Sequence, residues 1–404
     1  YEIHERLVGS EMCIRDRSEN RSKLLPQINA IAGYNNNFDP PVSVTDGSSY
    51  GVPYNITKTL QHSANAGLEM QMPLFNQTLY TSMSIAKVME EISRLSYGKA
   101  REDVILQISK MYYLGQVTAE QIMLIKANIT RLEELRDITQ AFFDNGMSME
   151  VDLKRVNINL ENLKVQYDNA QAMMKQQLNM LKYIMDYPAE KEIALTPVNT
   201  DSITTVALTG LSENIYELQL SQSQVQLAER QKKIITNGYI PSLSLTGSWR
   251  YAAYTDKGYH WFHSGPSNQW FRSYGVGLTL RIPIFDGLDK TYKIKKAMID
   301  IENKRLAWED ARKNLQTQYL NAVNDLMNNQ RNFKKQKDNY LLAEDVYAVT
   351  SDRYREGIAS MTEVLQDEMQ MSEAQNNYIS AHYNYRVTNL MLLKLTGQIE
   401  SLVK

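Results

Sequence analysis

Apolar and polar residues alternate with a period of two in four segments of the chain. Residues 276–282 and 243–251 are the clearest runs, with leucine, valine or an aromatic residue at every second position. A strand with one apolar and one polar face has this period. The pattern predicts strands at about 27–38, 64–73, 242–254 and 272–284. A soluble sheet packed on one side would show the same alternation, but nearly all the remaining sequence is long helix that has a seam of its own.

The helical segments are unusually long. Residues 76–143 and 286–356 contain no proline, and at about 1.5 Å per residue each would reach about 100 Å. Each is followed by a glycine turn and then by apolar residues that step by three and four. This step is typical of helices packed side by side. The pattern predicts helices at about 76–143, 147–186, 211–237, 286–356 and 360–396, and it places Asp367 in the last seam.

The second half of the chain repeats the first. The segment around Pro26 returns 215 positions later at Pro241, the segment around Pro73 returns 210 positions later at Pro283, and the turn at residues 143–146 returns 211 positions later. Matches in the same order at nearly the same offset indicate duplication. We therefore divide the chain into a first repeat, residues 18–200, and a second repeat, residues 201–404.

Residues 1–17 share no pattern with either repeat. They resemble translated sequencing-adapter read-through, and we interpret them as a non-native segment. The second repeat carries a full helix before Pro241, whereas residues 18–24 are only a stub of one. We expect the first repeat to be truncated, which would also explain why no signal peptide is visible.

Four of the ten prolines fall at predicted crossings between helix and strand. Pro26 and Pro241 are expected where a helix gives way to a strand, and Pro73 and Pro283 where a strand gives way to a helix. Proline fixes φ and lacks an N–H group, so it suits places where one hydrogen-bond pattern ends and another begins.

Composition and net charge argue against several classes of function and structure. A net charge of −2 argues against a nucleic-acid partner, and no run of about 18 apolar residues predicts a transmembrane helix. The single cysteine, Cys13, excludes internal disulfides. The five histidines are scattered, and we find neither a nucleophile motif nor a ligand cluster, so we predict no enzyme activity, no cofactor and no metal site.

Aromatic residues gather in the connection between the last two predicted strands. Trp261, Phe262 and Trp270 lie there, and aromatic rings are favoured where an apolar band of strands meets the water interface of a membrane. Four amphipathic strands cannot close a barrel, because about eight is the smallest closed number. An open sheet in lipid would leave backbone groups unpaired. Several copies of the chain must therefore share one barrel.

The paired proline junctions, the Phe/Tyr-x-x-Gly turns and the duplicated order resemble the TolC-type outer membrane efflux channel family. The resemblance covers about residues 18–397. It implies a mixed α/β membrane protein: a homotrimer with a twelve-stranded β-barrel in outer membrane lipid, continued by a periplasmic α-helical barrel. Such a trimer is a passive, gated exit duct of a tripartite efflux pump or type I secretion system, joined to a periplasmic adaptor and an inner-membrane transporter.

The resemblance also implies roles for individual residues. Phe143, Gly146, Tyr354 and Gly357 correspond to the periplasmic helix tips that dock onto the adaptor. Six residues past each glycine, Asp152 and Glu363 stand where the family places acids that line or latch the aperture. A second acid is common nine residues past, but this chain has Arg155 and Gln366 there. Tyr354 matches a tyrosine that ties the tips shut, and we expect it to bond to Asp152.

Simpler interpretations remain open. The two acids could be solvated helix surface, or acids favoured by the positive end of a helix. The whole chain could be a periplasmic coiled-coil adaptor, but an adaptor would have one hairpin and compact glycine-rich β-domains. A non-porous helical scaffold would leave the alternating strands unexplained. The sequence does not identify the exported substrate or the transporter class.

Overall fold

The protein is described by a computed structural model that covers residues 15–46, 48–197, 210–255 and 270–403. It divides into two compact units. The sheet unit contains Val8–Arg94 and Gln222–Leu306, and the helical unit contains Leu95–Ser221 and Ala307–Lys404. Most of the proposed non-native segment (residues 1–14) and most of the aromatic connection (residues 256–269) lie outside the described residues, and residues 15–22 are helical.

The sheet unit is built on one antiparallel four-stranded sheet. Its strands follow the order β1-β4-β5-β6. The register pairs Ala30 with Leu68, Leu68 with Trp249 and Trp249 with Tyr274, so these side chains lie on one face of the sheet, as the period of two predicts. The bounds of the four strands are β1 (Gln27–Asn36), β4 (His62–Phe75), β5 (Ser242–Thr255) and β6 (Trp270–Arg281).

A hairpin that we did not predict lies in the connection between β1 and β4. Strands β2 (Val42–Asp46) and β3 (Tyr54–Lys58) pair in antiparallel fashion, with Val44 opposite Ile56. The signal was present, because apolar residues alternate with polar ones in both short strands. We missed it because two five-residue runs are weak evidence beside the longer strands.

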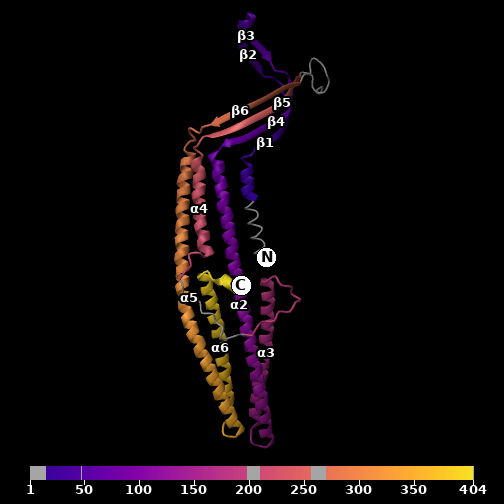
Figure 1. The fold of residues 1–404 in the computed structure, drawn as a ribbon. Helices are drawn as coiled ribbons and strands as arrows, with labels where there is room; N and C mark the ends of the chain where they lie inside the picture. Colours follow the sequence, from indigo (N-terminus) through magenta and orange to yellow (C-terminus); the bar gives the residue numbers. More distant parts are fainter. Residues whose placement is uncertain (1–14, 47, 198–209, 256–269, 404) are drawn as a thin grey trace. The chain divides into compact units, whose positions relative to one another are not determined.

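Long helices make up the rest of the chain. α2 and α5 contain 68 and 67 residues, and α3 and α6 contain 35 residues each. Figure 1 shows α2 joined to α3 and α5 joined to α6 by turns at the same end of the helical unit. None of the described helices is long and apolar enough to be a candidate membrane-spanning helix. The bounds are α2 (Gln77–Asp144), α3 (Glu150–Ile184), α4 (Tyr216–Asn237), α5 (Asp289–Arg355) and α6 (Met361–Leu395), with 3₁₀ helices η1 (Ser48–Tyr50) and η2 (Ile399–Val403).

Three of the four prolines lie at junctions as predicted. Pro26 and Pro241 come directly before β1 and β5, and Pro283 lies between β6 and α5. The prediction for Pro73 is wrong in detail: it lies inside β4, opposite Ser244, where the register shifts at a bulge. A bulge leaves a residue outside the regular ladder, so proline is tolerated there.

The core of the helical unit lies where α2, α3, α5 and α6 meet. A continuous cluster of buried side chains joins all four helices: Leu132, Leu135, Val156, Leu160, Tyr347, Tyr354, Val364 and Met371 are among its members. In α3 the buried positions form a single narrow stripe, whereas α6 buries residues over most of its circumference. α6 is therefore the central helix of the unit.

The prediction that Asp367 belongs to the seam of α6 is wrong. Asp367 is only half-buried, whereas the next residue, Glu368, is 4% exposed. The predicted seam takes one position from each turn of the helix. Because α6 packs against several helices, a second set of positions is buried as well, and Glu368 belongs to that set.

A polar cluster crosses this core farther from the tips. The Tyr378 hydroxyl donates to Glu120 Oε1 at 2.8 Å, and His382 Nδ1 lies 3.3 Å from Glu120 Oε2. Burial acts to raise the pKa of the Glu120 carboxyl, but the hydrogen bonds from His382 and Tyr378 hold it below its usual value. The cluster fixes α2 against α6 through directional contacts.

Candidate functional site

One face of the four-stranded sheet is apolar and exposed. On β6, Tyr274, Val276 and Leu278 are 79, 81 and 67% exposed. Leu68 and Trp249 extend the same face across β4 and β5. Contiguous exposed apolar surface of this kind marks contact with another protein or with a membrane.

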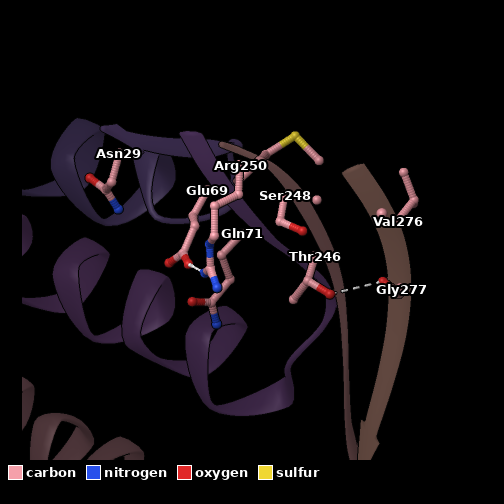
Figure 2. Close-up of a pocket in the computed structure, with 11 residues that line it drawn as sticks. Asn29, Glu69, Gln71, Thr246, Ser248, Arg250, Val276 and Gly277 are labelled. Carbon is pink, nitrogen blue, oxygen red and sulfur yellow. Dashed lines mark hydrogen bonds and ion pairs between the residues drawn. The ribbon is translucent and has the colours of Figure 1, made fainter. Parts of the chain in front are cut away.

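The opposite face of the sheet is polar and lined by small residues. A hollow of about 520 Å³ lies over it, and Figure 2 shows Glu69 and Arg250 reaching toward each other across it. Arg250 Nη2 lies 2.5 Å from Glu69 Oε1. Besides these two, the lining includes Asn29, Gln71, Thr246, Ser248, Gly275 and Gly277. This face is suited to contact with water and polar solutes.

The Glu69–Arg250 pair neutralises most of the charge on the polar face. Both side chains are nearly half exposed, so the pair contributes only about 0–1 kcal/mol to stability. Its effect is therefore on the surface: a carboxylate and a guanidinium that are paired to each other present little net charge to passing solutes. Arg281, at the end of β6 on the same face, adds a positive charge.

Both outer strands of the sheet have a free edge. In the described part of the chain, β1 pairs only with β4 and β6 pairs only with β5. Each edge therefore presents a row of backbone N–H and C=O groups that no other described strand pairs with. Such edges are templates for pairing with another strand.

The two helix tips share one backbone geometry. Gly146 and Gly357 have φ of +72° and +73°, and their N–H groups donate to the carbonyls of Phe143 and Tyr354 at 2.9 Å in both cases. The next N–H in each tip bonds five residues back. This is the Schellman arrangement, which needs a left-handed residue and so favours glycine.

The aromatic residues of the tips differ in position. Phe143 is 38% exposed, whereas Tyr354 is 6% exposed and its ring centroid lies 5.6 Å from that of Phe142. The expected bond from Tyr354 to Asp152 is not formed. The Tyr354 hydroxyl donates to Thr139 Oγ1 at 3.3 Å, because the buried ring points toward α2 and the neighbouring side chain there is a threonine.

The two candidate aperture acids have different partners. Asp152 pairs with Arg155 Nη1 at 3.3 Å. Glu363 accepts from the backbone N–H of Ser360 at 2.8 Å, while Ser360 Oγ accepts from the Glu363 N–H at 3.3 Å. The hydrogen bonds that the Ser360 N–H and the Ser360 hydroxyl donate to the Glu363 carboxylate lower the pKa of that carboxyl. Glu363 therefore belongs to a capping box, a role that the Ser-x-x-Glu spacing could have revealed.

Within the described ranges, we find no group of three or more His, Cys, Asp or Glu residues that could hold a metal ion. The features that stand out are an amphipathic sheet with free edges, an exposed apolar face, and helices with turns at one end. Such features suit assembly and passage of solutes.

A comparison with protein families decides the identity. The model of the family described as outer membrane efflux protein matches residues 16–185 and 207–398. The chain belongs to this family. The match covers all the labelled helices and strands except the 3₁₀ helix η2, which begins just past its end.

Individual proteins that are similar to this chain are also outer membrane proteins. Outer membrane protein TolC of Vibrio cholerae is 21% identical over 398 residues, covering 95% of this chain and 84% of that protein. Toluene efflux pump outer membrane protein TtgC of Pseudomonas putida is 23% identical over 379 residues, covering 89% and 75%. The fold is similar to that of CusC, with a TM-score of 0.80 at 15% identity over 98% of this chain and 89% of the other.

The resemblance inferred from the sequence is confirmed. The protein is the outer membrane channel component of an efflux pump, and it is a passive conduit, not an enzyme. It is located in the outer membrane and spans into the periplasm. The alternatives of a periplasmic adaptor and a non-porous scaffold are set aside.

Proposed function

We propose that three copies of this chain form one closed channel: a twelve-stranded β-barrel that is continued by an α-helical barrel. The observation that carries this proposal is the four-stranded sheet with two free edges and an exposed apolar face. Each unpaired backbone group would cost several kcal/mol in lipid. Four strands cannot remove their own edges by closing, so the edges must be paired between copies.

The strand directions permit this closure. Each strand in the sheet is antiparallel to its neighbour, so β1 and β6 run in opposite directions. β6 of one copy can therefore continue the antiparallel pattern with β1 of the next. Such head-to-tail contacts close into a ring when the rotation permits, and three copies supply twelve strands.

The helical unit has two different exposed apolar faces, one on α3 and one on α5, that can form the contact between neighbouring copies. On α3, Ile158, Val165 and Met173 are exposed about every two turns, at 60, 58 and 53%. On α5, Leu320 and Leu342 are exposed apolar residues of the same kind. A head-to-tail ring needs two unlike faces that meet. We propose that the α3 stripe of one copy packs against the α5 stripe of the next.

The helix tips are the proposed docking surface for a periplasmic adaptor, which would connect the channel to an inner-membrane transporter. Met147 and Met149 at the first tip are 68 and 67% exposed, and Ile358 at the second is 62% exposed. Methionine-rich surfaces adapt to the shape of a partner. Phe143, Gly146, Tyr354 and Gly357 would shape these tips, and the cargo would be small molecules or, in type I secretion, proteins.

We further propose that the tips are the gate. Asp152, Glu363 and Tyr354 would stand at its aperture, and movement of the α2–α3 hairpin away from the α5–α6 hairpin would open it. Tyr354 packs on Phe142 and bonds to Thr139, both on α2, so it is well placed to hold the hairpins together. A ring of acids at a constriction favours cations.

The test is the size and conductance of the purified protein. We expect the mass of the detergent-solubilised protein, measured by light scattering, to correspond to three copies, and discrete conductance steps after reconstitution in planar bilayers. As a control, Val165→Lys on the α3 stripe should weaken the trimer, whereas Lys164→Arg beside it should not. A single copy that is monodisperse without detergent and forms no pore would reject the proposal.

A further inference from the structure

A groove lies between α3 and α6 in the helical unit, close to the tips. Its volume is about 890 Å³. Because α3 belongs to one hairpin and α6 to the other, the groove follows the line along which the two hairpins meet. Its lining is dominated by amide side chains, among them Asn159, Asn162, Gln166, Gln366, Gln370 and Asn376.

One carboxylic acid in this groove is buried without a partner. Glu368, on α6, is 4% exposed, and its Oε1 has no hydrogen-bond partner among the described residues. Val364 and Met371, one turn to either side, are fully buried. An ionised carboxylate in such a place would lose its hydration and gain nothing in exchange.

The charged groups around Glu368 are committed elsewhere. On α3, Arg155 pairs with Asp152 at 3.3 Å. Between α2 and α5, Arg131 pairs with Glu344 at 2.5 Å.

The remaining neighbours do not supply a positive charge. On α5, Tyr347 is buried, and burial, with a smaller effect from the Glu368 carboxylate, raises the pKa of its hydroxyl to about 12. On α6 itself, the nearest titratable side chains are Asp367 and the groove residue Glu373, which are also acids, and Glu363 is held in its capping box. Burial therefore dominates, and it raises the pKa of Glu368 to about 6.

The burial of Glu368 also limits what could bind it. Its free oxygen exposes almost no surface, so an ammonium group or a metal ion cannot reach it while the hairpins are packed. A proton can, and it removes the charge that makes burial costly. We propose that Glu368 is a proton-operated latch at the contact between α3 and α6: the protonated acid holds the hairpins together, and its ionisation favours their separation.

The sign of the pH effect follows from the two environments. Packing raises the pKa of Glu368 from 4.5 to about 6, so the packed state is fully favoured below 4.5. Its advantage is lost as the pH rises toward about 6. A shift of this size corresponds to about a 30-fold change in the equilibrium between packed and separated hairpins. The proposal rests on the gate motion proposed above, and acid would close the gate.

The test is a distance measurement across the groove. Asn162→Cys and Met369→Cys, both at exposed groove positions, carry spin labels in a Cys13→Ser background of the full chain. Double electron–electron resonance then follows the distance from pH 4 to 8. We expect the separated fraction to rise with a midpoint near pH 6 in the parent and to stay at its acid value in Glu368→Gln, because glutamine resembles the protonated acid.

Two further variants keep the result unambiguous. Glu373→Gln removes an exposed acid that lines the same groove, and it should titrate like the parent. Glu368→Leu should remain packed at every pH, which guards against a special effect of glutamine. A parent that does not titrate, a Glu368→Gln variant that still titrates, or loss of titration in Glu373→Gln would each overturn the latch. The distances do not depend on conduction, so a chain that titrates but forms no pore would reject the channel proposal alone.

Discussion

The two tips of the helical unit have the same backbone and different side chains. Each turn has a left-handed glycine, and the glycine N–H bonds to the carbonyl three residues back at 2.9 Å. After the turns, however, α6 begins with the capping box of Ser360 and Glu363, whereas α3 begins at Met149 with no side-chain cap. The two tips therefore share what the turn requires of the backbone and differ in the first residues of the following helix.

The difference has a physical consequence for each tip. A capping box satisfies N–H groups that the helix leaves open, so the second tip is fixed by its own side chains. The first tip has no such cap and exposes Met147 and Met149. We interpret the second tip as the rigid one and the first as the more adaptable surface for a partner.

The largest loss of stability is expected when the two turn glycines are replaced. Gly146→Ala and Gly357→Ala should each lower stability by about 1–2 kcal/mol, because a residue with a Cβ is strained at positive φ. Nothing lies within 4 Å of a Cβ at either position, so the two losses should be nearly equal. Chemical denaturation in detergent measures them. Asparagine at the same positions should cost less, and a loss at one tip only would show that the turns are not equivalent.

A smaller change in stability is expected when the N-cap residues of α6 and α3 are replaced. Ser360→Ala should cost about 1 kcal/mol, the usual value for a lost N-cap. Met149→Ser should instead stabilise the first tip by some tenths of a kcal/mol, because it creates a Ser-x-x-Asp sequence ending at Asp152. Hydrogen exchange over the first turns of α3 and α6 measures both changes. If Ser360→Ala leaves hydrogen exchange in the first turn of α6 unchanged, the capping box does not make the second tip the more rigid one.

The acids are expected to affect conduction, and Glu363→Ala also removes one half of the capping box of the second tip. Replacing Asp152 and Glu363 together with Ala should raise single-channel conductance and weaken cation preference in planar bilayers, because a negative ring at a constriction attracts cations. Glu150→Ala, an exposed acid paired with Lys154, is the matched control. Unchanged conductance and selectivity in the double variant would remove these acids from the gate while leaving the fold intact.

Some features of the fold follow directly from sequence pattern. The alternation at residues 243–251 is visible as β5, and the long proline-free segments are visible as α2 and α5. These predictions rest on periodicity over many residues, which local sequence contains in full. The family was recognisable for the same reason, because the repeat places several independent signals in one order.

Other features could not be predicted in this way. Glu368 differs from Asp367 by one position on one helix, and only the packing of several helices around α6 decides which of the two is buried. Tyr354 bonds to Thr139 because the ring turns toward α2, and no local pattern contains that direction.

The sequence by itself determined the four long strands, the long helices and the two glycine turns, because each depends on residues close together in the chain. Tertiary structure alone decided the partner of Tyr354 and the burial of Glu368, because a side chain's environment is set by helices that are distant in sequence. The free edges of the sheet depend on both the sequence pattern and the tertiary structure. The pattern provides four strands, and their order β1-β4-β5-β6 leaves two edges that this chain cannot close.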